Sequence, residues 1–140
     1  MKILITGGTT FVSRYAAEHF VSKGNEVFVL NRNSRPQSQG VHLINCDRLN
    51  LGNKFADEHF DLILDITAYT DEHIKALLKS GISFDDYIFI SSSAVYPETN
   101  PQPFAENQTC GKNSVWGDYG INKLNAEKYL LDTVQNAYIL

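Results

Sequence analysis

Six short apolar runs recur along the chain, and each is continuous rather than alternating and rich in isoleucine, valine and leucine. The runs are Ile3–Thr6, Val27–Leu30, Val41–Cys46, Leu62–Thr67, Tyr87–Ser91 and Ala137–Leu140. Continuous apolar runs of this length are typical of strands that are buried on both faces of a sheet. The pattern therefore predicts six buried strands.

Between these runs, apolar residues recur with the period of a helix. The helical stretches are Phe11–Lys23, Asp71–Lys79 and Asp118–Gln135. Gly24 and Gly81 follow the first two as end signals, and the acidic residues that open the last two, at Asp71 and Asp118, suit the positive end of a helix dipole. Strands that alternate with helices predict an α/β fold with a parallel sheet and right-handed crossovers.

Size, charge and cysteine usage limit the classes of protein that fit. A chain of 140 residues, of which 43% are hydrophobic, suits one domain with one core. Its net charge of −4 disfavours nucleic acid and membrane surfaces as main partners. The first apolar run is too short for a signal peptide or a membrane span, so we expect a cytoplasmic protein. Cys46 and Cys110 lie far apart and the four histidines are dispersed, which predicts reduced thiols and no metal.

The first strand runs into a glycine-containing turn and then a helix, with the sequence TGGTTFVS over residues 6–13. In a dinucleotide-binding fold, glycines at three spaced positions make the turn, admit the pyrophosphate and let helix and strand pack closely. Gly7 holds the first position, whereas Thr10 and Ser13 stand at the other two. The turn alone fits any strand–turn–helix equally well. Its place after the first strand, before a helix amino terminus, favours phosphate binding.

Three further positions at strand ends are candidates for cofactor contacts. Asn31 and Arg32 follow the second strand, where a neutral residue and nearby guanidiniums favour NADP over NAD, unless the arginines only solubilise a loop. Asp47 follows the third strand, where it accepts a hydrogen bond from the adenine amino group or caps a turn. Thr67 and Ala68 end the fourth strand, where they line the ribose–pyrophosphate path or simply pack.

Serines and a Tyr-x-x-x-Lys pair supply candidate chemistry. Ser91 to Ser93 end the fifth strand, at the carboxyl edge where ligands bind in open α/β sheets. Tyr119 and Lys123 lie four apart, so in a helix they share one face, and the ammonium favours the phenolate form. Turn capping and a solvated helix face are the structural alternatives. Together these groups predict proton transfer beside a bound cofactor.

These motifs resemble the extended short-chain dehydrogenase/reductase family, specifically its NAD-dependent epimerase/dehydratase group. The resemblance rests on the turn over residues 6–12, the fourth strand over 61–68, the serines with Val95 and Tyr96, and the Tyr119–Lys123 pair. It implies a Rossmann-type doubly wound parallel sheet over residues 1–140 as a NAD(P)-binding domain. Because the last apolar run ends the chain without a polar tail, we expect a truncated chain that lacks the smaller carboxyl-terminal substrate lobe.

The resemblance also implies roles for individual residues. Ser92 would be the catalytic hydroxyl with Ser93 as second candidate, Tyr119 the acid/base, and Lys123 both its activator and a contact to the nicotinamide ribose. The cofactor contacts are expected at Gly7, Thr10, Phe11, Val12, Asn31, Arg32, Asp47, Thr67, Ala68 and Lys123.

The implied function is hydride exchange at the carbinol of a nucleotide-activated sugar, in an epimerase, dehydratase or reductase. We expect the full-length protein to be the enzyme and these 140 residues alone to be inactive. The alternative is a non-catalytic NAD(P)-binding sensor or RNA-associated regulatory protein of the same fold. A homodimer is compatible with both.

Overall fold

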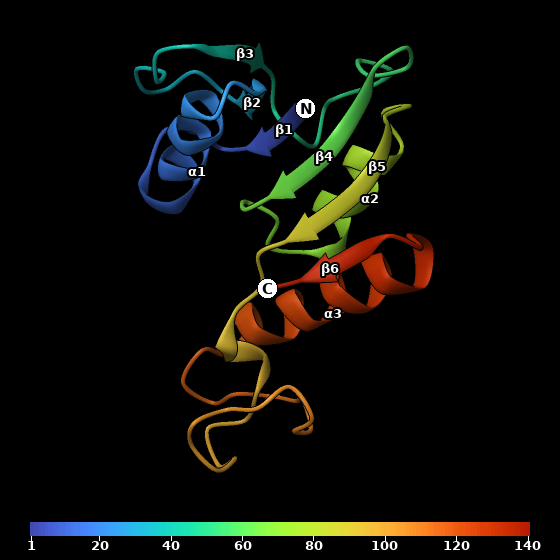
Figure 1. Cartoon of the computed structure of the whole chain (residues 1–140). Helices are drawn as coiled ribbons and strands as arrows, with labels where there is room; N and C mark the ends of the chain where they lie inside the picture. Colours follow the sequence, from blue (N-terminus) through green and yellow to red (C-terminus); the bar gives the residue numbers. More distant parts are fainter.

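The computed structural model describes residues 1–140 as a six-stranded parallel sheet with helices on both faces (Figure 1). The strands are β1 (Lys2–Thr6), β2 (Glu26–Asn31), β3 (Val41–Asn45), β4 (His59–Asp65), β5 (Ser83–Phe89) and β6 (Ala137–Ile139). The helices are α1 (Phe11–Ser22), α2 (Asp71–Leu78) and α3 (Asp118–Thr133), with a short 3-10 helix η1 (Ser93–Val95). The predicted α/β Rossmann-type fold is confirmed.

The strand order is β3-β2-β1-β4-β5-β6, so the order reverses between β1 and β4. In such doubly wound sheets, ligands bind outside the carboxyl ends of the strands at this switch point. The residues that end β1, β2, β3 and β4 therefore surround the expected site.

Each face of the sheet has its own apolar cluster. On one face α1 packs through Ala17 against side chains such as Ile3 and Val29. On the other face α2 and α3 pack through residues such as Ile74 and Leu130 against Ile63 and its neighbours. Continuous apolar runs were needed to fill both layers, which explains why the strand pattern does not alternate.

The strand boundaries differ from the prediction at β4 and β5. Both strands begin several residues earlier, at His59 and Ser83, and end at Asp65 and Phe89 rather than at Thr67 and Ser91. Their first halves carry polar residues such as Asp61 and Asp85, which hide a strand from a search for apolar runs.

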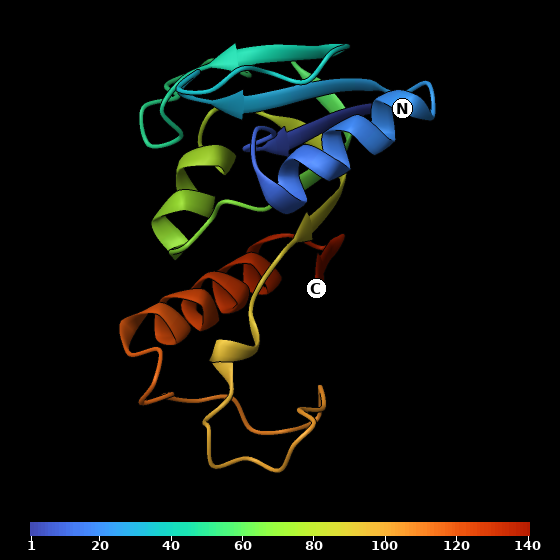
Figure 2. The same cartoon turned by 90° about the vertical axis from the view of Figure 1, so that its left-hand side faces the viewer.

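The segment from Pro97 to Gly117 contains no regular element and lies as an orange loop below α3, at the bottom of the view in Figure 2. None of the three α-helices combines the length and the apolar composition that a membrane crossing requires. Both cysteines are free thiols, as the sequence predicted.

Candidate functional site: the carboxyl edge of the sheet

The turn between β1 and α1 is shaped by Gly7. Its φ of +98° is a backbone conformation that residues with side chains rarely adopt, and its N–H donates to the Leu30 carbonyl at 2.9 Å. A Cβ at this position would lie 3.0 Å from both Ser13 Oγ and Thr67 Cγ2. Because only a glycine leaves this space open, the turn fits a ligand that approaches the main chain closely, as a pyrophosphate does.

The structure explains how Thr10 and Ser13 replace glycines. Thr10 has an extended backbone, with φ of −142°, which any residue can adopt. Ser13 is buried and its Oγ donates to the Thr10 carbonyl at 2.8 Å. The positive φ instead falls on Gly8, where a Cβ would lie 2.5 Å from Val29 Cγ1, and on Phe11, whose side chain is 91% exposed.

A cavity of about 390 Å³ opens beside this turn, within the range of small-molecule sites. Five of the predicted cofactor residues line it: Gly7, Asn31, Arg32, Asp47 and Thr67. Seven further residues complete its wall: Leu30, Ser34, Cys46, Arg48, Leu49, Tyr69 and His73. The other predicted cofactor residues, Thr10, Phe11, Val12, Ala68 and Lys123, lie outside this wall, and Ala68 is fully buried. All ten contacts stay predictions.

Asn31 and Asp47 already make hydrogen bonds within the chain. The Asn31 side-chain amide donates to the Gly7 carbonyl at 2.6 Å and to Gln37 Oε1 at 3.0 Å, so it ties the glycine turn to the loop after β2. Asp47 Oδ1 accepts the N–H of Leu49 at 2.9 Å, which shows the turn-capping role. The second carboxylate oxygen of Asp47 remains available, since a carboxylate accepts several hydrogen bonds.

A buried ion pair joins Asp65 at the end of β4 to Arg48, which follows β3 and lines the cavity. The two guanidinium nitrogens Nη1 and Nη2 donate to Oδ1 and Oδ2 of Asp65 at 2.9 and 2.8 Å. Tyr87 and Thr6 donate their hydroxyls to the same carboxylate at 2.6 and 2.7 Å. Arg48 also reaches Thr67 Oγ1 at 3.2 Å, so the pair supports the wall of the cavity.

The surroundings of this pair hold the protonation states of Asp65 and Tyr87 fixed. Burial alone would raise the pKa of Asp65, but the Arg48 charge and the hydrogen bonds from Arg48, Tyr87 and Thr6 outweigh it and hold the pKa below its usual range. Burial together with the Asp65 charge raises the pKa of the Tyr87 phenol well above its ordinary value. The carboxylate therefore stays ionised and the phenol stays neutral, and the network is rigid rather than titrating.

The two elements that carry or adjoin the predicted catalytic residues, α3 and η1, pack against each other at the other end of the same edge, and the catalytic roles stay predictions. Ser92 Oγ accepts the N–H of Ala94 at 3.2 Å and so caps η1. Lys123 is 2% exposed, and its Nζ donates to the Ile90 carbonyl at 2.8 Å. Burial lowers the pKa of Lys123 to about 8, against the attraction of Asp65 and Glu127. The ammonium form still predominates at neutral pH.

Tyr119 is held through its ring. The ring centroid lies 6.1 Å from that of Tyr69 and 6.2 Å from that of Trp116. Lys123 Nζ also lies 5.6 Å from the Tyr69 ring centroid, which brings the ammonium to the same aromatic group. Tyr69 is thus the residue that lines the cavity and also contacts Tyr119 and Lys123, so it joins the two ends of the site.

Gly120 sets how closely α3 approaches η1. A Cβ on Gly120 would lie 2.1 Å from the Ala94 carbonyl oxygen, a distance that no side chain tolerates. The helix that carries Tyr119 therefore reaches the segment that carries Ser92 only because residue 120 is a glycine.

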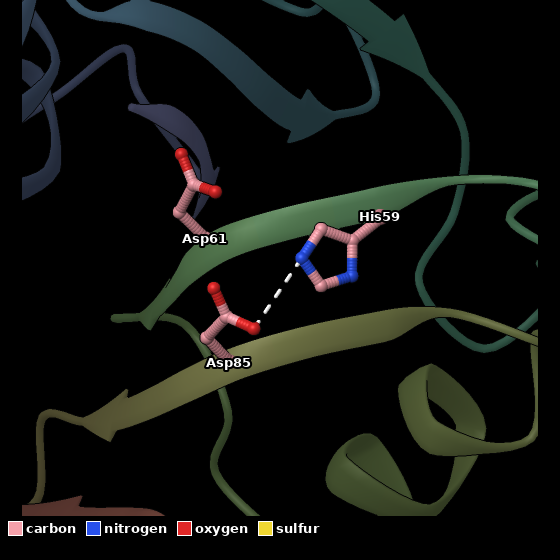
Figure 3. A group of neighbouring side chains, drawn as sticks. All are labelled: His59, Asp61 and Asp85. Atoms are coloured by element: carbon pink, nitrogen blue, oxygen red, sulfur yellow. Dashed lines mark ion pairs between the residues drawn. The ribbon is translucent and has the colours of Figure 1, made fainter.

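A separate polar group lies near the amino ends of β4 and β5 (Figure 3). Potential ligand atoms of His59, Asp61 and Asp85 lie within 4.8 Å of one another. His59 Nε2 pairs with Asp85 Oδ1 at 3.4 Å, and Asp61 Oδ2 accepts the N–H of Lys2 at 2.7 Å. Because each side chain already has a protein partner and two of them are exposed, an ion pair explains the cluster. The expectation of no metal stays a prediction.

Sequence reasoning missed Arg48, Asp65, Tyr69, His73 and Gly120. One signal was present, because Asp65 is a charge inside an apolar run and a buried carboxylate needs a cationic partner. Its partner was not readable, since Arg48 follows β3 and the strand order separates β3 from β4 by two strands.

Comparison with known proteins identifies the family of the chain. The sequence model of the NAD dependent epimerase/dehydratase family matches residues 3–76, which carry the glycine turn, the cavity and the buried ion pair. The chain belongs to this family.

Solved structures of epimerases share the fold. A UDP-glucose 4-epimerase superposes with a TM-score of 0.82 at 21% identity, covering 99% of this chain and 50% of that one. The UDP-glucuronic acid 4-epimerase of Bacillus cereus, solved with UDP-glucuronic acid and NAD, gives 0.77 at 20% identity, with 99% and 55% coverage. The chain therefore spans about half the length of these enzymes.

One relative is named for binding a stem-loop and not for an epimerase activity. The chloroplast stem-loop binding protein of 41 kDa b from Arabidopsis thaliana is 26% identical over 132 residues, which cover 81% of this chain and 35% of the relative.

Proposed function

We propose that the protein binds a nicotinamide dinucleotide along the carboxyl edge of the sheet, as the cofactor-binding part of an epimerase or dehydratase that acts on a nucleotide-activated sugar. The observation that carries the proposal is the Gly7 turn, whose open space borders the cavity at the switch point of the sheet. The family match over this region and the UDP-glucuronic acid in the complex of the Bacillus cereus epimerase support it.

The residues of this chain would divide the work as follows. The cavity side would hold the adenosine half, with Gly7 next to the pyrophosphate and Asp47 next to the adenine. Tyr119 would take the proton of the sugar hydroxyl while Ser92 holds its oxygen. Lys123, as an ammonium, would favour the phenolate form of Tyr119. The nicotinamide, when bound, supplies the hydride acceptor.

NADP is favoured over NAD within this proposal. Arg32 and Ser34 line the cavity after β2, and no carboxylate stands at the end of that strand. A guanidinium attracts a 2′-phosphate, whereas an acidic residue there would repel it. Arg32→Glu should therefore reverse the preference between the two cofactors, whereas Lys23→Glu on the far end of α1 should not.

Thermal unfolding with and without cofactor tests the binding proposal. A ligand that binds only the native state raises the melting temperature in proportion to the logarithm of its concentration. We expect NADPH to stabilise the protein more than NADH does. If neither changes the melting temperature while the protein stays folded, dinucleotide binding is refuted. Turnover is tested on the full-length protein with UDP-glucose, UDP-N-acetylglucosamine and UDP-glucuronic acid.

RNA binding is the second candidate, because the Arabidopsis relative is named for a stem-loop. The net charge of −4 argues against a general polyanion surface, so any RNA contact would be local. A gel-shift titration with a hairpin RNA at low salt, with and without NADPH, distinguishes RNA binding from the proposed enzymatic function. Tight RNA binding that Tyr119→Phe leaves unchanged, without any cofactor binding, would favour the RNA-associated protein. A homodimer and a cytoplasmic location stay predictions.

A further inference from the structure

We propose that His73 recognises the adenine base of the dinucleotide together with Asp47, so that the site selects adenine over bases with a carbonyl in place of the amino group. This inference rests on the proposed function, because it assigns a part of the same cavity. It adds a residue to base recognition that neither the glycine turn nor the Tyr-x-x-x-Lys pair would indicate.

The position of His73 is fixed at both its ring and its main chain. It is the third residue of α2 and lines the same cavity as Asp47. Its Nδ1 accepts the N–H of Tyr69 at 3.0 Å, and its carbonyl accepts Nη2 of Arg48 at 3.0 Å. Arg48 is in turn held by Asp65, so the buried ion pair positions the histidine.

The hydrogen bond from Tyr69 decides which ring nitrogen of His73 carries the proton. A neutral imidazole has one donor and one acceptor nitrogen, and Nδ1 is already the acceptor. The proton therefore lies on Nε2, so the ring of this cavity-lining residue has a donor left for a ligand. Burial and the Arg48 charge lower the pKa of His73, which keeps the ring neutral near pH 7.

Asp47 supplies the complementary group. Its Oδ1 accepts the Leu49 N–H, and the carboxylate has further lone pairs for a ligand. The wall thus offers one acceptor and one donor. Adenine presents an amino donor next to a ring-nitrogen acceptor, which matches this pair, whereas guanine presents a carbonyl oxygen where adenine has its amino group. That oxygen would face the Asp47 carboxylate.

A purely structural role is the competing explanation, because His73 also accepts the Tyr69 N–H at the start of α2. Two substitutions separate these roles. His73→Asn keeps an acceptor near the Nδ1 position and loses the donor at Nε2. His73→Gln places an amide donor near the Nε2 position. His42→Gln, on the exposed edge strand β3, is the matched control.

The experiment measures dissociation constants of three ligands by calorimetry for the wild type and these three variants. The ligands are NADH, its analogue with hypoxanthine in place of adenine, and reduced nicotinamide mononucleotide, which lacks the adenosine half. Unpaired polar groups in a binding site cost about tenfold or more in affinity. We therefore expect the wild type to bind the hypoxanthine analogue about tenfold more weakly than NADH.

For the variants, we expect His73→Asn to weaken NADH binding about fivefold to tenfold and to leave the mononucleotide unchanged. His73→Gln and His42→Gln should stay within about twofold of the wild type. Equal binding of NADH and the hypoxanthine analogue, or wild-type NADH affinity in His73→Asn, would overturn the inference alone. Failure of the wild type to bind any dinucleotide would instead refute the proposed function, and the inference with it.

Discussion

The two ends of the carboxyl edge are built differently. At the pocket end, around Gly7, Arg48 and Asp65, buried charges and hydroxyls hold one another through short, paired hydrogen bonds. At the catalytic end, Ser92 bonds only to its own turn and Tyr119 is held by ring packing, while Lys123 donates to a main-chain carbonyl. The pocket end is therefore pre-organised for a ligand, whereas the catalytic end depends on the approach of α3 to η1. The family match over residues 3–76 falls on the first of these ends.

Breaking the buried ion pair should have the largest effect on stability. Asp65→Ala leaves the Arg48 charge buried without its partner, and such losses cost about 3 to 5 kcal/mol. Urea unfolding of this variant, with the exposed Arg32→Ala as control, measures the difference. We expect the control to stay within about 0.5 kcal/mol of the wild type. Similar free energies of unfolding for the two variants would show that this ion pair does not stabilise the pocket end.

Lys123 should give the catalytic end a stability that rises with pH. Its folded-state pKa of about 8 lies below the usual value near 10.5. Between these two pH values the unfolded chain binds more protons, so raising the pH favours the folded state. The gain should reach roughly 2 to 3 kcal/mol by about pH 10. In urea unfolding measured from neutral to alkaline pH, Lys123→Met should lack this rise in the free energy of unfolding. If the free energies of the variant and the wild type changed in parallel with pH, Lys123 would not be the source of the rise.

Only a part of the difference between the two ends of the edge could be predicted from the sequence. Gly7, Asp47, Tyr119 and Lys123 could be named as candidates because each stands at a fixed offset from a strand end or from another motif residue, and their roles stay predictions. The roles of Arg48 and Gly120 depend on which elements lie side by side, and local periodicity carries no information about that.

Gly120→Ala tests whether the two ends of the carboxyl edge work independently. The added Cβ clashes with the Ala94 carbonyl, so α3 must move away from η1 at a cost of about 1 to 3 kcal/mol. Gly111→Ala is the control, because its Cβ would meet only Pro97 at 3.4 Å. If the full-length protein is the proposed enzyme, we expect the Gly120 variant to lose turnover and to keep most of its affinity for AMP. Loss of AMP binding in step with turnover would mean that the ends are not independent.

Tyr119→Phe should have the smallest effect on stability. The substitution keeps the ring that packs against Tyr69 and Trp116, so unfolding should change by less than about 0.5 kcal/mol. Under the proposed mechanism, turnover of the full-length protein should nevertheless fall sharply, because the proposed proton acceptor is gone. A variant with wild-type turnover would remove Tyr119 from the mechanism.

Energy transfer from Trp116 to a reduced nicotinamide tests the central claim most directly. Trp116 is the single tryptophan of the chain and lies beside Tyr119, whereas the adenosine half would bind at the Gly7 end. Titration with NADPH should quench Trp116 saturably and produce sensitised nicotinamide emission, which AMP, as a competitor for the cavity, should reverse. Gly7→Ala, the smallest substitution at this position, should weaken the signal, and circular dichroism of the same sample checks that the variant is folded. A folded wild-type protein that shows no transfer with either NADPH or NADH would contradict a dinucleotide bound along this edge.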